Sequence, residues 1–183
     1  VLVHGVSVGE VKAAQALILN LEELGYEVVV SATTDTGLVV AAKLYGASRV
    51  ARFPLDFSPV VSRFLRVVSP DAVLLVELEV WPSFLFVANR IGLPVAVVNG
   101  RITERSYESY ERLRYLLPQF HRISMFCVQD AEYAERFRAL SSEQRLIEIT
   151  GNIKFDALPV ETRAPDAAFR KLLLGSFDGA VVV

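Results

Sequence analysis

The stretch Val1-Leu-Val-His-Gly-Val-Ser-Val-Gly-Glu10 has the pattern of a buried strand that runs through a turn into a helix. The stretch Val73-Leu-Leu-Val-Glu-Leu-Glu-Val-Trp-Pro82 repeats this pattern. Each places a carboxylate where its strand ends, and in an open parallel sheet that edge is where ligands bind. The two segments therefore predict an α/β sheet with a polar site at its carboxyl edge.

Length and composition limit the classes of protein to which this chain can belong. The chain has 183 residues, of which 52% are hydrophobic and 22% charged, which fits one folded domain and excludes a disordered chain. A net charge of -2 gives no general reason to expect nucleic-acid binding. The one cysteine, Cys127, lies in an apolar run and is expected to be a small buried hydrophobe, which fits a reducing compartment. No apolar run approaches the roughly 18 residues that span a bilayer.

Short β-branched runs alternate with helical patterns along the whole chain. The expected strands are residues 1–6, 27–32, 49–53, 72–78, 95–98, 123–129, 146–150 and 180–183. The expected helices are residues 10–24, 36–45, 59–68, 82–91, 106–120, 130–140 and 166–174, with Ser58 as the cap of the third helix. This alternation predicts a doubly wound parallel sheet. Because both chain ends fall in strand patterns, we expect a piece of a longer protein: one domain over residues 1–156, then a linker and the start of a second domain over 157–183.

The turn Ser7-Val-Gly-Glu10 permits three interpretations. It matches a capping box, in which Ser7 and Glu10 close the first turn of a helix. With Gly5 it also matches G-x-S-x-G, the nucleophile elbow of α/β-hydrolases, but His4 lies inside the strand and no second histidine is expected at this edge. Thirdly, Glu10 at a helix N-terminus can act as a general base, with Gly9 leaving room for a substrate. The residues alone do not choose between capping and catalysis.

Glu77 ends the most apolar strand, where a carboxylate needs a partner or a solvated crevice. If the strand continued, Glu79 would share its face. The structural alternative is an ion pair with an arginine such as Arg101, and Trp81 is expected to pack rather than to stack on a sugar. Glu10 and Glu77 are expected to leave the sheet at the same edge.

Three further polar loops follow strands. The hydroxyls of Thr33, Thr34 and Thr36 suit an anion or sugar hydroxyls, although a well-capped helix start is the simpler explanation. Arg101 could hold a phosphate or carboxylate, or be an ordinary solvated charge. Lys154 precedes the expected linker and could point into an interdomain cleft or simply lie at the surface.

Taken in order, six segments of the chain resemble the bacterial Kdo transferases, which move 3-deoxy-D-manno-octulosonic acid (Kdo) from CMP-Kdo onto the lipid A precursor. The segments are His4-Gly-Val-Ser-Val-Gly-Glu10, Thr33-Thr-Asp-Thr-Gly37, Phe53-Pro-Leu-Asp56, Val76-Glu-Leu-Glu-Val-Trp-Pro82, Val98-Asn-Gly-Arg-Ile-Thr-Glu-Arg-Ser106 and Thr150-Gly-Asn-Ile-Lys-Phe-Asp156. The resemblance implies the N-terminal half of a two-domain glycosyltransferase-B (GT-B) architecture with Rossmann-like domains.

The resemblance also implies roles for residues. Glu10 matches the family's general base, Glu77 a second active-site acid and Lys154 a lysine at the domain junction. The acceptor site would comprise Ser7, Gly9, Thr33, Thr34, Thr36 and Arg101. Transfer would be inverting and would need neither a metal nor a cofactor, with CMP-Kdo held mainly by the second domain.

The expected setting is the cytoplasmic face of the bacterial inner membrane, where the protein is peripheral or anchored by a segment outside this chain. Residues 59–68, with Arg63 and Arg66, are a candidate membrane surface, or else an ordinary core-packed helix. The chain alone is expected to be inactive. The alternatives are a glycosyltransferase that uses another nucleotide sugar and a non-catalytic anion-binding α/β module.

Overall fold

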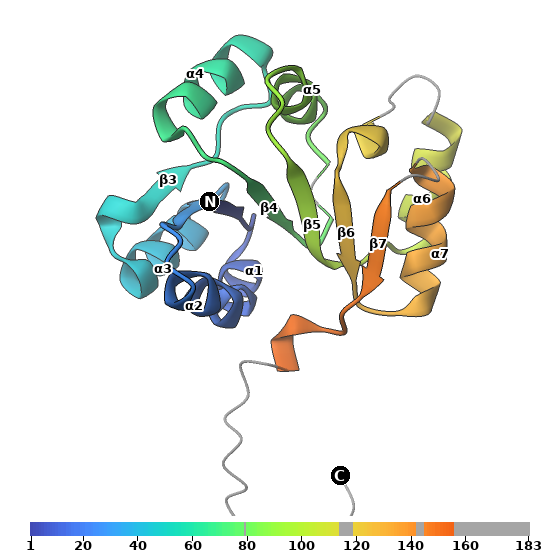
Figure 1. Cartoon of the computed structure of the whole chain (residues 1–183), viewed down its shortest axis with the longest axis horizontal. Coiled ribbons are helices and arrows are strands. Elements are labelled where there is room, and N and C mark those ends of the chain that lie inside the picture. The colour runs from blue at the N-terminus through green and yellow to red at the C-terminus, as the bar shows by residue number, and fades with distance from the viewer. Residues whose placement is uncertain (79, 114–118, 142–144, 156–183) are drawn as a thin grey trace, which may run out of the picture.

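The computed structural model describes residues 1–78, 80–113, 119–141 and 145–155. Its strands form one seven-stranded parallel sheet in the order β3-β2-β1-β4-β5-β6-β7 (Figure 1). They are β1 (Leu2–His4), β2 (Val29–Ala32), β3 (Val50–Arg52), β4 (Val73–Val76), β5 (Val95–Gly100), β6 (Met125–Val128) and β7 (Leu146–Ile149). This topology confirms the predicted Rossmann-like doubly wound sheet.

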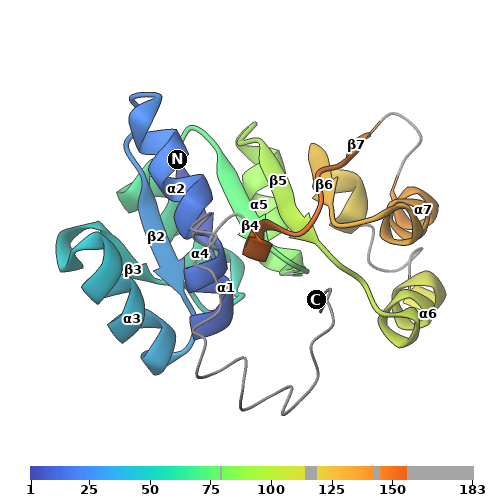
Figure 2. The ribbon, with the colours of Figure 1, turned by 90° about the horizontal axis from the view of Figure 1, so that it is seen from below.

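Helices cover both faces of the sheet (Figures 1 and 2). The α-helices are α1 (Val8–Ala13), α2 (Gln15–Glu23), α3 (Asp35–Tyr45), α4 (Ser58–Val68), α5 (Pro82–Arg90), α6 (Glu104–Leu113) and α7 (Ala131–Leu140). The described residues also form three 3-10 turns, η1 (Ala47–Arg49) before β3, η2 (Gln119–Arg122) before β6 and η3 (Ile153–Phe155) after β7. The first three helices pack on one face and α4 to α7 on the other.

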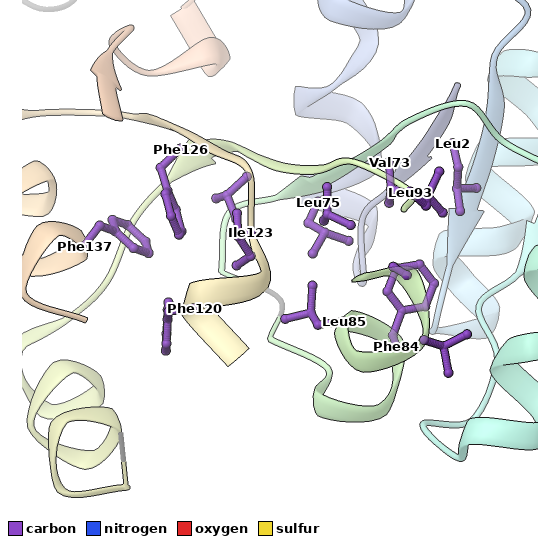
Figure 3. Close-up of a cluster of buried hydrophobic side chains, with 14 of the residues drawn as sticks. Leu2, Val73, Leu75, Phe84, Leu85, Leu93, Phe120, Ile123, Phe126 and Phe137 are labelled. Atoms are coloured by element: carbon purple, nitrogen blue, oxygen red, sulfur yellow. The ribbon is translucent and has the colours of Figure 1, made fainter. Parts of the chain in front are cut away.

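Successive residues of a strand point into two different hydrophobic cores. In β1, Leu2 joins the core under α4, α5 and α7, whereas Val3 joins the core under α1 and α3. Figure 3 shows the first core, where Phe84 of α5 and Phe137 of α7 are fully buried. Burying such a side chain contributes roughly 1.5–3 kcal/mol. A sheet covered on both faces explains why most strands are continuous apolar runs.

Local signals placed most helix ends correctly. Thr34 and Asp130 cap α3 and α7 by accepting from Gly37 N and Tyr133 N. The predicted cap of α4 was wrong: Phe57 is the N-cap residue, without a side-chain bond, and Ser58 is already helical. The Ser58 carbonyl accepts from Ser62 Oγ at 2.7 Å, as a helical residue can.

Two helices of the structure differ in extent from the helices that the sequence predicts. The pattern over residues 10–24 is divided into α1 and α2 at Ala14, whose N–H donates to the carbonyls of both Glu10 and Lys12. Ala14 is a strong helix former and is buried, so periodicity could not indicate the break. The pattern over 106–120 begins earlier, at Glu104, and residues 114–118 lie outside the described residues. The elements expected at 166–174 and 180–183, with the linker at 157–183, also lie outside them.

The order of the strands determines where a ligand can bind. The chain adds β2 and β3 on one side of β1, then returns to place β4 on the other side. The loops after β1 and β4 therefore diverge, and ligands of doubly wound sheets bind at such a switch point. After β7 the chain turns back so that η3 lies beneath the carboxyl ends of β4 and β5 (Figures 1 and 2).

Candidate functional site at the switch point of the sheet

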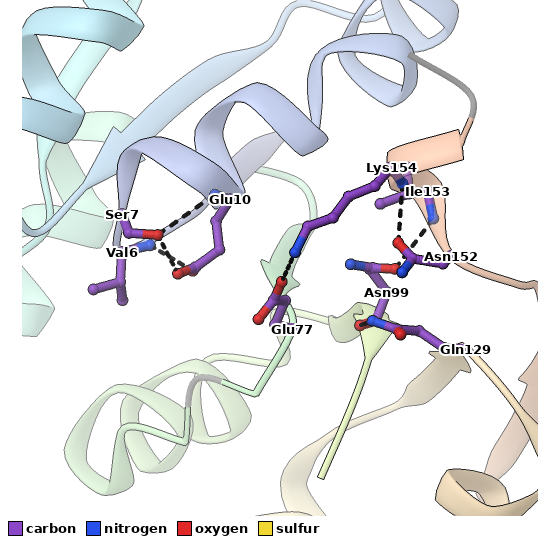
Figure 4. Close-up of polar contacts among 9 residues, drawn as sticks. All are labelled: Val6, Ser7, Glu10, Glu77, Asn99, Gln129, Asn152, Ile153 and Lys154. Atoms are coloured by element: carbon purple, nitrogen blue, oxygen red, sulfur yellow. Dashed lines mark hydrogen bonds and ion pairs between the residues drawn. The ribbon is translucent and has the colours of Figure 1, made fainter. Parts of the chain in front are cut away.

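Glu10 lies in the first turn of α1, directly after β1. Its Oε2 accepts from Val6 N at 2.8 Å and its Oε1 from the Ser7 hydroxyl at 2.7 Å, while Glu10 N approaches Ser7 Oγ at 3.5 Å (Figure 4). The capping-box interpretation is therefore confirmed, in a form that bonds Val6 N instead of Ser7 N. The contacts leave the carboxylate half-buried and fixed in direction.

Two glycines bracket this turn. A Cβ on Gly5 would lie 3.0 Å from Glu10 Cβ and 3.2 Å from Val11 N, so the absence of a side chain lets α1 pack directly against the end of β1. A Cβ on Gly9 would meet only Ser7 Oγ within 4 Å, at 3.8 Å, and Gly9 is exposed. Gly9 thus leaves the surface open beside Glu10, as the sequence predicts.

Glu77 lies where β4 ends, and its backbone is left-handed with φ of 64°. Its N–H still donates to Val98 O at 2.9 Å, so the change of direction follows directly on the sheet. The strand alternation that would have paired Glu77 with Glu79 ends at Val76, and Glu79 lies outside the described residues.

The partner of Glu77 is Lys154, not the arginine considered above. Lys154 Nζ donates to Glu77 Oε1 at 2.9 Å across 77 positions of the chain (Figure 4). The Glu77 side chain is 23% exposed and that of Lys154 46%, so water reaches the pair and screens its attraction. Lys154 therefore faces the same edge of the sheet as Glu77. Arg101 is exposed after β5.

Asn99 holds the loop that carries Lys154, and sequence reasoning missed this residue. It is 2% exposed at the end of β5 and, with φ of 55°, is also left-handed. Its Oδ1 accepts from Ile153 N at 3.1 Å and its main-chain carbonyl from Gln129 Nε2 at 3.1 Å. An asparagine at the end of a buried strand is a signal for a left-handed exit, because asparagine tolerates that conformation.

The three threonines of the loop after β2 are not in equivalent positions. Thr34 is engaged in structure, since its hydroxyl donates to Val6 O at 3.0 Å and accepts from Gly37 N at 3.1 Å. This contact joins the start of α3 to the turn that holds Glu10. Thr36 is exposed and Thr33 is half-buried.

An apolar groove of about 480 Å³ adjoins Thr33. Its apolar lining is formed by Phe53, Leu55, Val60, Phe64, Val67 and Trp81. Arg52 and Arg63 also line the groove; Arg52 pairs with Asp35, whereas Arg63 has no ion pair within the described chain. A larger hollow of about 770 Å³ runs between α4 and α5, from Ser58 to the loops that precede β4 and β5.

His4 is a core residue, as expected. It is fully buried, its Nδ1 lies 3.0 Å from Ser31 Oγ, and its ring stacks on Phe53 with 3.7 Å between centroids. Burial lowers the pKa of His4 to about 4, so the ring is neutral near pH 7. Because the Ser7 hydroxyl bonds Glu10 and His4 faces Ser31, these residues do not form the serine–histidine pair that a hydrolase needs.

Trp81 packs as predicted, with its ring centroid 5.6 Å from that of Phe53. Cys127 is only half-buried, contrary to expectation, because the face of β6 that carries it is incompletely covered in the described chain. Burial and the nearby Glu148 raise the pKa of its thiol.

Metal-ligating side chains do not gather in threes among residues 1–78, 80–113, 119–141 and 145–155. Among the described helices, none combines the length and the hydropathy that a bilayer-crossing segment requires.

The sequence matches one family model over residues 1–157, that of 3-deoxy-D-manno-octulosonic-acid transferase (kdotransferase). Curated relatives include the 3-deoxy-D-manno-octulosonic acid transferase of Bordetella pertussis, 35% identical over 87% of this chain and 39% of the relative. The enzyme of the same name from Chlamydia muridarum is 29% identical over 98% of this chain and 43% of the relative. A bifunctional glycosyltransferase/methyltransferase of Fusobacterium nucleatum is 32% identical over 84% of this chain and 25% of the relative. The chain thus spans less than half the length of these relatives.

Solved structures show the same fold at much lower identity. The UDP-GlcNAc 2-epimerase of Neisseria meningitidis aligns with a TM-score of 0.64 at 15% identity, over 96% of this chain and 53% of that one. The UDP-GlcNAc 2-epimerase of Methanocaldococcus jannaschii aligns with a TM-score of 0.60 at 15% identity, over 82% of this chain and 45% of that one.

Proposed function

The chain belongs to the 3-deoxy-D-manno-octulosonic acid (Kdo) transferase family, and from this premise we propose that it supplies the acceptor site and the general base for transfer of Kdo from CMP-Kdo to a lipid A precursor. The observation that carries the proposal is the Glu10 carboxylate, fixed at the switch point of the sheet, in a chain whose Glu77–Lys154 pair faces the same edge. The second half of the GT-B architecture, outside this chain, would bind most of CMP-Kdo.

Glu10 would remove the proton from the acceptor hydroxyl as that oxygen attacks the anomeric carbon, while CMP departs from the opposite face. Positioning is the main requirement of such an inverting step, and the Val6 N–H and Ser7 hydroxyl supply it by fixing both carboxylate oxygens. Gly9 would let the acceptor sugar approach, and Thr33, Thr36 and Arg101 would bind its polar groups. Thr34 would act mainly by holding this turn against α3.

Lys154 would offset negative charge on the carboxylate of Kdo or on the departing phosphate. Glu77 would orient Lys154 through their 2.9 Å contact and would stabilise positive charge that develops on the sugar. No step of this scheme requires a metal or an organic cofactor, because the leaving group is already activated as a phosphate ester.

The apolar groove beside Thr33 suits the acyl part of a lipid acceptor. The adjoining outer surface of α4 carries Val67, 77% exposed, together with exposed Val60, Arg63 and Arg66. Apolar and basic side chains together favour the surface of an anionic membrane. We propose that the full-length enzyme works at the cytoplasmic face of the bacterial inner membrane, with α4 toward the lipid.

The first experiment compares the full-length parent protein with its Glu10→Gln variant in transfer of Kdo from CMP-Kdo to a tetraacyl lipid A precursor. We expect Glu10→Gln to lose about 10²-fold or more in kcat, because general-base catalysis contributes about 10²–10⁴-fold. Glu132→Gln is the matched control, since Glu132 also lies in the first turn of a helix but at α7.

Each other outcome has a distinct meaning. Retained transfer by Glu10→Gln would reduce Glu10 to a helix cap, and equal losses in both variants would indicate a general effect on stability. No transfer by the wild-type protein would favour another nucleotide-sugar donor. A wild-type protein that transfers no sugar from any nucleotide-sugar donor would favour the non-catalytic anion-binding module. The fragment of residues 1–183 alone is expected to be inactive.

A further inference from the structure

Asn99 has one polar group that the fold does not use. Its side-chain Oδ1 accepts from Ile153 N at 3.1 Å, and its main-chain carbonyl accepts from Gln129 Nε2 at 3.1 Å. The amide nitrogen, Nδ2, is buried and has no hydrogen-bond partner within the described residues. A buried donor without a partner is destabilising, so an unpaired donor at a ligand-binding edge calls for an explanation.

The chemistry of the contacts identifies the unpaired atom as a donor. An asparagine amide can be rotated to exchange its oxygen and nitrogen, but Ile153 N–H is itself a donor and requires an acceptor. The oxygen must therefore face Ile153, which leaves the NH2 group directed the other way. Figure 4 shows this nitrogen pointing toward the side on which Lys154 reaches Glu77.

The backbone keeps this donor in place. Glu77 and Asn99 end the neighbouring strands β4 and β5, and both have left-handed backbones, with φ of 64° and 55°. Two non-glycine residues in that region are held by their surroundings, a pattern that concentrates at ligand-binding sites. Here the sheet contact of Glu77 N with Val98 O and the two bonds accepted by Asn99 maintain the arrangement.

We propose that Asn99 is a substrate-binding residue whose Nδ2 donates, beside the Lys154 ammonium, to an anionic oxygen of the donor substrate. An amide N–H and an ammonium at one place form a site for a carboxylate or phosphate oxygen, because both donors then face negative charge. Glu77 orients Lys154 through their ion pair. This inference rests on the proposed function and adds a residue and a ligand group to it.

The test uses the full-length enzyme and the variant Asn99→Asp. Aspartate tolerates the left-handed backbone and retains an oxygen that accepts from Ile153 N, but it removes the NH2 donor. Asn152→Asp is the control for the added charge: Asn152 lies in the loop that Asn99 holds, and its Oδ1 accepts from Lys154 N at 3.0 Å, so this variant adds the same charge close to Lys154 and keeps its acceptor. Thermal unfolding of each variant shows whether the fold is retained.

We expect Asn99→Asp to raise the KM for CMP-Kdo at least tenfold in a protein that still folds, although it melts at a lower temperature because the new carboxylate is buried. Asn152→Asp should change the KM by less than about threefold. Equal KM values for wild type and Asn99→Asp would overturn the proposal, as would equal increases in both variants. Titrations with free Kdo and with CMP distinguish the sugar carboxylate from the phosphate, according to which ligand binds more weakly to Asn99→Asp.

A wild-type enzyme that transfers no Kdo would refute the proposed function and not this inference. Titration of the wild type and both variants with inorganic phosphate then tests the donor role of Asn99. Phosphate binding that weakens in Asn99→Asp but not in Asn152→Asp supports that role. Binding that is equal in all three proteins overturns it.

Discussion

Glu10 is held by the same two contacts that close the first turn of α1. Val6 N and the Ser7 hydroxyl each bind one carboxylate oxygen, so the cap also determines where the carboxylate points. Capping and general-base catalysis are compatible for this reason. An incoming acceptor hydroxyl needs only to approach the Oε1 that Ser7 now binds, and the bond from Val6 N can remain throughout the reaction.

His4, three residues upstream of Ser7, makes the stability of the chain depend on pH. Burial lowers its pKa in the folded state to about 4, from the ordinary histidine value of 6.5. Between these values the unfolded chain binds more protons than the folded one, so stability is full above about pH 6.5 and falls as the pH drops toward 4. From pH 7 to pH 5 we expect a loss of about 2 kcal/mol in the free energy of unfolding.

Denaturant titrations of the wild type, His4→Gln and His121→Gln from pH 7 to pH 5 test this expectation. The His4→Gln variant, neutral at every pH, should lose most of that slope whatever its stability at pH 7. His121 is exposed, so His121→Gln should keep the slope. An undiminished slope in His4→Gln would show that other groups cause the acid sensitivity.

At the scale of elements, helix α5 shows how a distant residue can complete a local structure. Its N-cap residue, Trp81, makes no side-chain capping bond. The Asp56 carboxylate, from the loop before α4, accepts instead from Ser83 N at 3.1 Å and from Phe84 N at 2.8 Å. A carboxylate at this position also interacts favourably with the positive end of the helix dipole.

Removing this remote cap should therefore destabilise the fold. We expect Asp56→Ala to lower the free energy of unfolding by about 1–2 kcal/mol, as loss of an N-cap does. Asp71→Ala is the control, because Asp71 is exposed and makes no hydrogen bond within the described chain. Chemical denaturation measures both, and an Asp56→Ala variant as stable as Asp71→Ala would show that water replaces the cap.

The contrast between α5 and α1 indicates how far sequence reasoning reaches. The strand, turn and cap that position Glu10 all lie within ten residues, so their pattern could be read directly. The contact of Lys154 with Glu77 spans 77 positions, and the residues alone left open whether Lys154 points into an interdomain cleft or simply lies at the surface. The resemblance to a family singled out Lys154, but it did not indicate the pairing. Asn99 was missed because its role depends on Ile153 and Gln129, from two other loops.

At the scale of the whole molecule, the doubly wound sheet separates two surfaces. Helices α1 to α3 cover one face and α4 to α7 the other, with the switch point between them at the carboxyl edge. The apolar groove lies on the side of α4, next to the threonine loop. If the proposed lipid acceptor holds its acyl part in this groove, the membrane lies on the α4 side.

This geometry predicts that a negative charge added to the surface of α4 weakens membrane binding, whereas one added to the surface of α3 does not. Val67 of α4 is 77% exposed and Val39 of α3 is 69% exposed, so neither needs to be apolar for folding. In the full-length enzyme, Val67→Asp should weaken binding to anionic vesicles and lower transfer to a vesicle-bound acceptor by about tenfold, because a carboxylate is repelled by anionic lipid and disfavoured at its apolar boundary. Val39→Asp should leave both quantities unchanged.

With a short-chain acceptor dispersed in detergent, Val67→Asp should regain most of its activity, since no membrane then has to be reached. Equal vesicle binding by the two variants would exclude α4 as the membrane surface, and a loss that persists in detergent would show that Val67 acts through the groove that it lines.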